Sequence, residues 1–273
     1  MTQSLPIYQL DAFAEAPFTG NPAAVVPLDS WPDDAVMQAI AAENNLAETA
    51  FFAPTPDDPD SDYRIRWFTP TVEASLCGHA TLASGAVLFD RLDFPGDRIR
   101  FASQGGPLAV ERAGRGAGQT RFALDFPSRP PTPAPAPEGL AAMLGGVEPV
   151  AFLKAVKNLA VMADETAVRA VQPDLKAIAA LPGDGLVVTG PGDAADAASR
   201  YFAPHAGIDE DPVTGSAHCT VAPYWAERLG KTALHCRQVS RRGGDLYCTL
   251  TDGGNRVRIE GSVQFYLEGR IRV

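Results

Sequence analysis

The stretch EASLCGHATLASG, residues 73–85, places a thiol, Cys77, and an imidazole, His79, on either side of Gly78 at the start of a predicted helix. The positive end of a helix lowers the pKa of a thiol, so Cys77 could serve as a nucleophile or a base. His79 could donate to a substrate or carry a proton. Both residue types are also common as buried structural groups, so the stretch by itself decides neither role.

Two carboxylates elsewhere in the chain could perform acid–base chemistry. Glu48 opens the apolar run ETAFFA, and burial there would raise its pKa toward neutrality, where one group can remove and return a proton. A solvated surface position is the alternative for Glu48. Asp211 lies in IDEDPVTGSAH, either as a turn residue or, five residues before Ser216, at the rim of a second helix start. Asp209 and Glu210 are interpreted as solvated loop charges.

A metal site is not predicted. Cys77, His79, His218 and Cys219 form two soft-ligand pairs, but Cys-x-His and adjacent His-Cys are not usual spacings for zinc ligands. Adjacent helical residues also point about 100° apart, which hinders binding of one ion. The motifs GxSxG, HExxH, Walker A and GxGxxG after a strand are absent from the sequence. We expect no metal and no organic cofactor.

The two halves of the chain resemble each other. IRWFTPTVEASLCGHATLA in the first half and SRYFAPHAGIDEDPVTGSAHCT in the second share an Arg-aromatic-Phe start, an acidic stretch, a glycine and a helix start. Aligning Gly78 with Gly215 places Thr214 opposite Cys77. The two helix starts are expected to face a shared inter-domain cleft, where their N–H groups would bind a small carboxylate.

A second pair of segments supports the repeat. GNPAAVVPLDSWPDDAVMQAIAA contains Asn21, KNLAVMADETAVRAVQPDLKAIAA contains Asn158, and both end in AIAA. Each half therefore suggests a strand that ends in Asn, a helix that ends in AIAA, further strands, and a second helix that follows a glycine. These second helices are predicted at 79–90 and 216–229. Runs of period two, such as YRIRWF and NRVRIEG, predict antiparallel strands.

The predicted fold class is α+β (α/β), with two related domains that each wrap a mostly antiparallel sheet around a helix. The first domain is predicted at 1–126 and the second at 141–262. A linker rich in Pro and Ala occupies 127–140, and the final run VQFYLEGRIRV, about 263–273, is expected to return to the first domain.

Composition narrows the classes of function. The net charge of −10 argues against partners such as nucleic acids and anionic membranes. No apolar run reaches the roughly 18 residues that a transmembrane helix needs. The start MTQSLPIYQLDAF has no signal-peptide pattern, and the four cysteines form no CxxC pair. A cytoplasmic protein with reduced thiols is expected.

The motifs DAFAEAPFTGNPAAVV, NNLAETAFF, RWFTPTVEASLCGHATLASG and SRYFAPHAGIDEDPVTGSAH, followed by YWAERLGK, resemble the PhzF-like family, the phenazine-biosynthesis protein F group. The resemblance covers essentially the whole chain. It implies the diaminopimelate-epimerase fold, with two pseudo-symmetric domains, each a barrel-like sheet around a central helix, and a site between them. It also implies a homodimer and a cofactor-free isomerase similar to the trans-2,3-dihydro-3-hydroxyanthranilate isomerase of phenazine biosynthesis.

The resemblance also implies roles for residues of this chain. Glu48 corresponds to the glutamate that removes a proton from carbon and returns it elsewhere, and His79 and Asp211 correspond to the histidine and aspartate of the same motifs. The expected substrate contacts are Asn21, Gly78, Gly215 and Ser216.

Two alternatives stay open. An amino-acid epimerase or racemase would use Cys77 as a second base, but the related epimerases use two cysteines and this chain has Thr214 at the second place. A non-catalytic binding protein on the same scaffold is the other alternative, and the retained Glu48, His79 and Asp211 speak against it.

Overall fold

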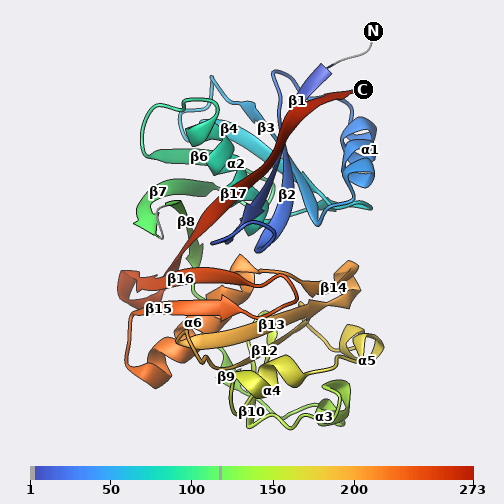
Figure 1. Cartoon of the computed structure of the whole chain (residues 1–273), viewed down its shortest axis with the longest axis vertical. Helices are drawn as coiled ribbons and strands as arrows, with labels where there is room; N and C mark the ends of the chain where they lie inside the picture. The colour runs from blue at the N-terminus through green and yellow to red at the C-terminus, as the bar shows by residue number, and fades with distance from the viewer. Residues whose placement is uncertain (1–3, 117–118) are drawn as a thin grey trace. The chain divides into compact units, whose positions relative to one another are not determined.

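The structure is a computed structural model that describes residues 4–116 and 119–273 (Figure 1). The chain divides into two compact units, Met1–Asp125 with Glu260–Val273, and Phe126–Ile259. Within the described residues, no helix is long and apolar enough to cross a membrane.

The first unit is a ring of hydrogen-bonded strands. β1 pairs with β2, β2 with β3, β3 with β4, β4 with β6, β6 with β7 and β7 with β8. β8 pairs with β17, and β17 pairs with β1, so the sheet closes into a barrel. The strands are β1 (Ser4–Ala12), β2 (Asn21–Pro27), β3 (Glu48–Pro54), β4 (Tyr63–Phe68), β5 (Glu73–Ala74), β6 (Arg98–Ala102), β7 (Leu108–Gly116), β8 (Gln119–Pro127) and β17 (Arg256–Arg272). The last two residues of β8 and the first four of β17 belong to the second unit.

Helix α2 (Gly78–Asp90) is the core of this barrel, whereas α1 (Asp34–Asn44) lies outside it (Figure 1). Eleven of the 13 residues of α2 are buried. Its sequence is rich in Ala, Gly and Ser, and such small side chains let the strands approach closely; Gly85 lies against Val110 of β7 with no room for a Cβ. The buried hydroxyl of Ser84 donates to the carbonyl of Ala80 at 2.8 Å, so this polar group has a hydrogen-bond partner inside the apolar core.

The second unit contains the remaining elements. Its strands are β9 (Thr132–Pro133), β10 (Ala151–Lys154), β11 (Asn158–Val161), β12 (Leu186–Pro191), β13 (Ala197–Ala203), β14 (Ile208–Asp211), β15 (Ala233–Gln238) and β16 (Gly244–Thr251). Its helices are α3 (Leu140–Met143), α4 (Glu165–Ala170), α5 (Leu175–Ala179), η1 (Pro204–Ala206), α6 (Gly215–Leu229) and η2 (Asp252–Gly254).

Both units repeat one order of strand pairing. From β1 to β2, β3, β4, β6 and β7, successive pairs are antiparallel, parallel, antiparallel, parallel and antiparallel. From β10 to β11, β12, β13, β15 and β16, the same sequence of pairings recurs. The predicted α+β class is therefore confirmed, and α2 and α6 each begin one residue earlier than the sequence suggested. One detail was wrong: Asn21 and Asn158 begin strands β2 and β11 rather than end a strand.

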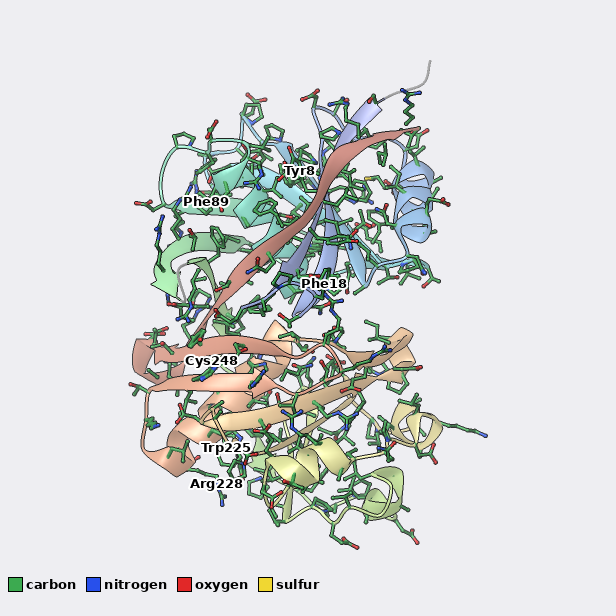
Figure 2. All side chains as sticks on the ribbon, in the orientation of Figure 1. Tyr8, Phe18, Phe89, Trp225, Arg228 and Cys248 are labelled. Carbon is green, nitrogen blue, oxygen red and sulfur yellow. The ribbon has the colours of Figure 1, made fainter. Side chains whose placement is uncertain are left out.

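A proline lies inside the buried helix α6. Pro223 has no N–H, so the carbonyl of Cys219, four residues earlier, has no helical donor. The backbone N–H of Arg129 donates to that carbonyl at 2.8 Å and replaces the missing bond. Further along α6, Trp225 (Figure 2) donates its indole N–H to Thr189 of β12 at 2.9 Å, which ties the helix to its sheet.

Matching arginine–glutamate pairs occur at equivalent places in the two units. Arg66 of β4 donates to both carboxylate oxygens of Glu73 at 2.7 and 2.8 Å. Arg200 of β13 does the same to Glu210 at 2.7 and 2.9 Å. The interpretation of Glu210 as a solvated loop charge was therefore wrong, because this carboxylate holds β14 against β13.

Candidate active site

The first unit brings Glu48 and His79 together. Glu48 is the first residue of β3 and His79 lies in the first turn of α2, and their side chains are both buried. Glu48 Oε2 lies 3.2 Å from His79 Nε2. The two atoms are close enough for an ionic contact, but the pair is not aligned as a hydrogen bond. Catalytic hydrogen bonds are often poorly aligned in a site without substrate, and a small rotation of either side chain would let this carboxyl and imidazole share a proton.

Strand β2 positions the other edge of the His79 ring. Asn21 is completely buried, and its Nδ2 lies 3.2 Å from His79 Nδ1. The carbonyl of Pro22 also accepts a hydrogen bond from the ring. Gly20 precedes this pair with φ of 74°, and a Cβ there would collide with the carbonyl of Ala12. The glycine therefore permits the tight entry into β2 that presents Asn21 to the imidazole.

Burial controls the charge of His79. Desolvation lowers the pKa of His79 to about 4, although the Pro22 carbonyl acts in the opposite direction. The ring is therefore neutral at pH 7. A neutral ring has two tautomers, and β2 offers a donor in the Asn21 amide and an acceptor in the Pro22 carbonyl. Nε2 can then donate to an ionised Glu48 or accept from a protonated Glu48.

Cys77 completes this cluster. Its Sγ lies 3.5 Å from His79 Nδ1, and the ligand atoms of Glu48, Cys77 and His79 all lie within 4.8 Å of one another. Cys77 is the extended N-cap residue and is not on the helix, so its thiol lies beside His79 although Cys-x-His is not a usual spacing for zinc ligands. A carboxylate, a thiolate and an imidazole are a donor set that zinc accepts.

The second unit contains Asp211, which is buried at the end of β14. Thr214 donates its hydroxyl to Asp211 Oδ2, and the backbone N–H of Thr214 donates to Gln238 Oε1 at 2.9 Å. Gln238 Nε2 donates to the carbonyl of Asp211 at 2.6 Å. This network fixes the loop that leads into α6.

The two buried helices begin in the same way. Cys77 and Thr214 are the N-cap residues of α2 and α6, and neither caps its helix through its side chain. A threonine at this position usually accepts from a first-turn N–H, but the hydroxyl of Thr214 is turned to Asp211. Gly78 is the first residue of α2, and Gly215 and Ser216 are the first two residues of α6. Both first turns are therefore without the usual side-chain cap, a condition that favours binding of an anion.

Comparison with known proteins shows the family of the chain. The model of the family described as phenazine biosynthesis-like protein matches residues 10–269. The chain belongs to this family. An uncharacterized isomerase of Pseudomonas aeruginosa is 48% identical over 269 residues, which are 98% of this chain and 99% of that protein.

Solved structures of the phenazine biosynthesis-like family share the fold. A PhzF-family protein of Enterococcus faecalis has a TM-score of 0.92 and 43% identity, and the match covers 99% of this chain and 100% of that one. A predicted epimerase of Pseudomonas aeruginosa has a TM-score of 0.76 and 25% identity, over 98% and 99% of the two chains. The fold is therefore the PhzF-like and epimerase-like fold, and the family membership supports an isomerase-type protein.

Sequence reasoning missed some members of these networks. Gln238 is completely buried in β15, and an isolated glutamine in a strand carries no signal of such a role. His218 is also completely buried, and its Nδ1 lies 2.8 Å from the carbonyl of Thr214. The position of His218 four residues after Thr214 was a usable signal, because side chains in a first turn can reach back to the N-cap carbonyl.

Proposed function

We propose that this protein is a cofactor-independent isomerase that moves a proton between carbon atoms of a small carboxylate substrate. The observation that carries the proposal is the buried Glu48 carboxyl at 3.2 Å from the neutral imidazole of His79. The substrate class follows the PhzF-like resemblance, with trans-2,3-dihydro-3-hydroxyanthranilate as the reference compound. No metal or organic cofactor is required in this proposal.

Glu48 is proposed as the group that carries the proton. The ionised carboxylate removes a proton from a substrate carbon, and the resulting carboxylic acid returns a proton to another carbon. His79 can pair with Glu48 in both of its protonation states, because one neutral tautomer of the imidazole donates to the carboxylate and the other accepts from the carboxylic acid. Acid–base catalysis of this kind contributes about 10²–10⁴-fold to a rate, and substrate orientation contributes the remainder.

The remaining site residues have proposed roles in binding. Asn21 orients His79, and the N–H groups at Gly78, Gly215 and Ser216 are proposed donors to substrate oxygens. Asp211, held by Thr214 and Gln238, is proposed to orient the substrate or relay its proton. The cytoplasmic location, the homodimer and a place in a biosynthetic pathway also stay predictions.

Proton NMR in D₂O tests this proposal. Wild-type protein should convert trans-2,3-dihydro-3-hydroxyanthranilate into an isomer that carries deuterium at the newly protonated carbon. The incorporation should be less than one equivalent whenever Glu48 returns the proton that it removed. Failure to consume this compound, combined with no C–H exchange in a panel of small amino and cyclic carboxylates, would contradict the isomerase assignment.

One observation favours an epimerase as a second candidate. Cys77 Sγ lies 3.5 Å from His79 Nδ1, which is an arrangement that can activate a thiol. In that case Cys77 would remove the proton from an amino-acid α-carbon. Deuterium exchange at such a carbon that disappears in Cys77→Ser would support the epimerase and count against the Glu48 mechanism.

A further inference from the structure

The second unit contains a buried lysine that the proposed mechanism does not use. Lys157 directly precedes β11, and only 8% of its surface is exposed. No described carboxylate lies within ion-pair distance of its ammonium, and burial lowers the pKa of Lys157. A largely buried charge that no carboxylate contacts directly is costly, so its retention needs an explanation.

The turn around Lys157 is firmly held. The backbone N–H of Asp184 donates to the carbonyl of Val156 at 3.1 Å. The side chain of Asn158 donates to the carbonyls of Pro182 and Gly185 at 2.9 and 3.0 Å. These bonds tie the residues on both sides of Lys157 to one loop, so the backbone that carries the ammonium is fixed in advance.

An aromatic ring lies beside the ammonium, and two carboxylates act on its charge. Lys157 Nζ lies 5.0 Å from the centre of the Tyr201 ring, a cation–π distance. Tyr201 pairs across the sheet with Asp211, and its hydroxyl donates to the carbonyl of Asp184. Asp184 and Asp211 both act on the charge of Lys157 and oppose the effect of burial on its pKa. Asp211 accepts from the hydroxyl of Thr214, the N-cap residue of α6, so Lys157 brings positive charge to the region where α6 begins without a side-chain cap.

We propose that Lys157 is a substrate-binding residue, whose ammonium, together with the first-turn N–H groups of α6, binds the carboxylate of the substrate. An anionic oxygen would contact the ammonium directly, which no described carboxylate does, and would satisfy N–H groups that Thr214 does not cap. Asp211 is a nearby negative charge, and it favours a ligand that carries an amino or hydroxyl group beside its carboxylate. That this ligand is also the molecule isomerised by Glu48 rests on the proposed function.

Calorimetric titration with anthranilate and 2-aminobenzamide tests the proposal, because the two probes differ only in the carboxylate. Wild-type protein should prefer anthranilate, and Lys157→Met should bind anthranilate about 10–100-fold more weakly with unchanged affinity for the amide. Lys154→Met is the matched control, since Lys154 is exposed three residues away, and it should bind both probes as the wild type does. Lys157→Arg keeps the positive charge and should retain part of the preference for anthranilate over 2-aminobenzamide.

Thermal unfolding without ligand separates binding from a structural role. Lys157→Met removes a largely buried charge that no carboxylate contacts directly, and it should raise the melting temperature. A lower melting temperature with equal loss of both probes would show that Lys157 is structural and overturn the proposal. So would a wild-type protein that does not distinguish the probes, or a Lys157→Met variant that binds anthranilate normally. Turnover by Glu48→Gln would overturn the proposed mechanism alone, and would leave the Lys157 result standing.

Discussion

The buried histidine of α6 should make the protein sensitive to acid. His218 is completely buried, and burial lowers its pKa to about 4, against about 6.5 in an unfolded chain. Between these values the unfolded chain binds a proton that the native protein does not, so stability is lost as the pH falls from 6.5 toward 4. Lowering the pH from 7 to 5 should therefore cost about 2 kcal/mol at this residue.

Urea unfolding at pH 7 and pH 5 measures this effect, with coincident fluorescence and circular dichroism transitions as the check on two-state behaviour. His218→Asn keeps a donor toward the carbonyl of Thr214 but removes the titrating group. The difference in stability between the two pH values should shrink by about 2 kcal/mol in this variant. It should not change in His205→Asn, because His205 is exposed. Equal pH dependence in His218→Asn and the wild type would show that His218 is not the source of the acid sensitivity.

Three further predictions concern the first unit. Cys77→Ser should keep isomerase turnover within a few fold of the wild type in a steady-state assay, and loss of turnover would favour the thiol alternative. Gly85→Ala should lower the free energy of unfolding by about 1–3 kcal/mol in urea titration, because the new methyl group would collide with Val110; unchanged stability would contradict the packing described for α2. Dialysis against a chelator should leave turnover unchanged, and restoration of lost activity by zinc would show that Glu48, Cys77 and His79 hold a metal.

The repeat made much of the fold predictable from the sequence. Gly78 and Gly215 marked the two buried helices to within one residue, and their alignment placed Cys77 opposite Thr214, both of which are N-cap residues. This succeeded because short motifs at helix starts depend on local backbone geometry. Family resemblance then supplied Glu48, whose partner His79 is 31 positions later in the chain and adjacent only in the folded barrel.

The remaining features of the site depend on tertiary contacts, which a local sequence pattern does not predict. The burial of Lys157 arises from the Tyr201 ring and from the loop that Asn158 holds. The closeness of Cys77 to His79 depends on the extended backbone of the N-cap, with φ of −143°, which a helical projection does not describe. Sequence spacing therefore did not predict that Cys77 and His79 lie together.

The turnover and ligand affinity of Glu48→Gln test directly whether Glu48 carries the proton. The amide keeps the size of the side chain but cannot accept and return a proton, so kcat should fall by about 10²–10⁴-fold while anthranilate still binds within a few fold of the wild-type affinity. Glu43→Gln, an exposed residue on α1, should behave as the wild type. Turnover of trans-2,3-dihydro-3-hydroxyanthranilate by Glu48→Gln at the wild-type rate would contradict the central claim that Glu48 carries the proton.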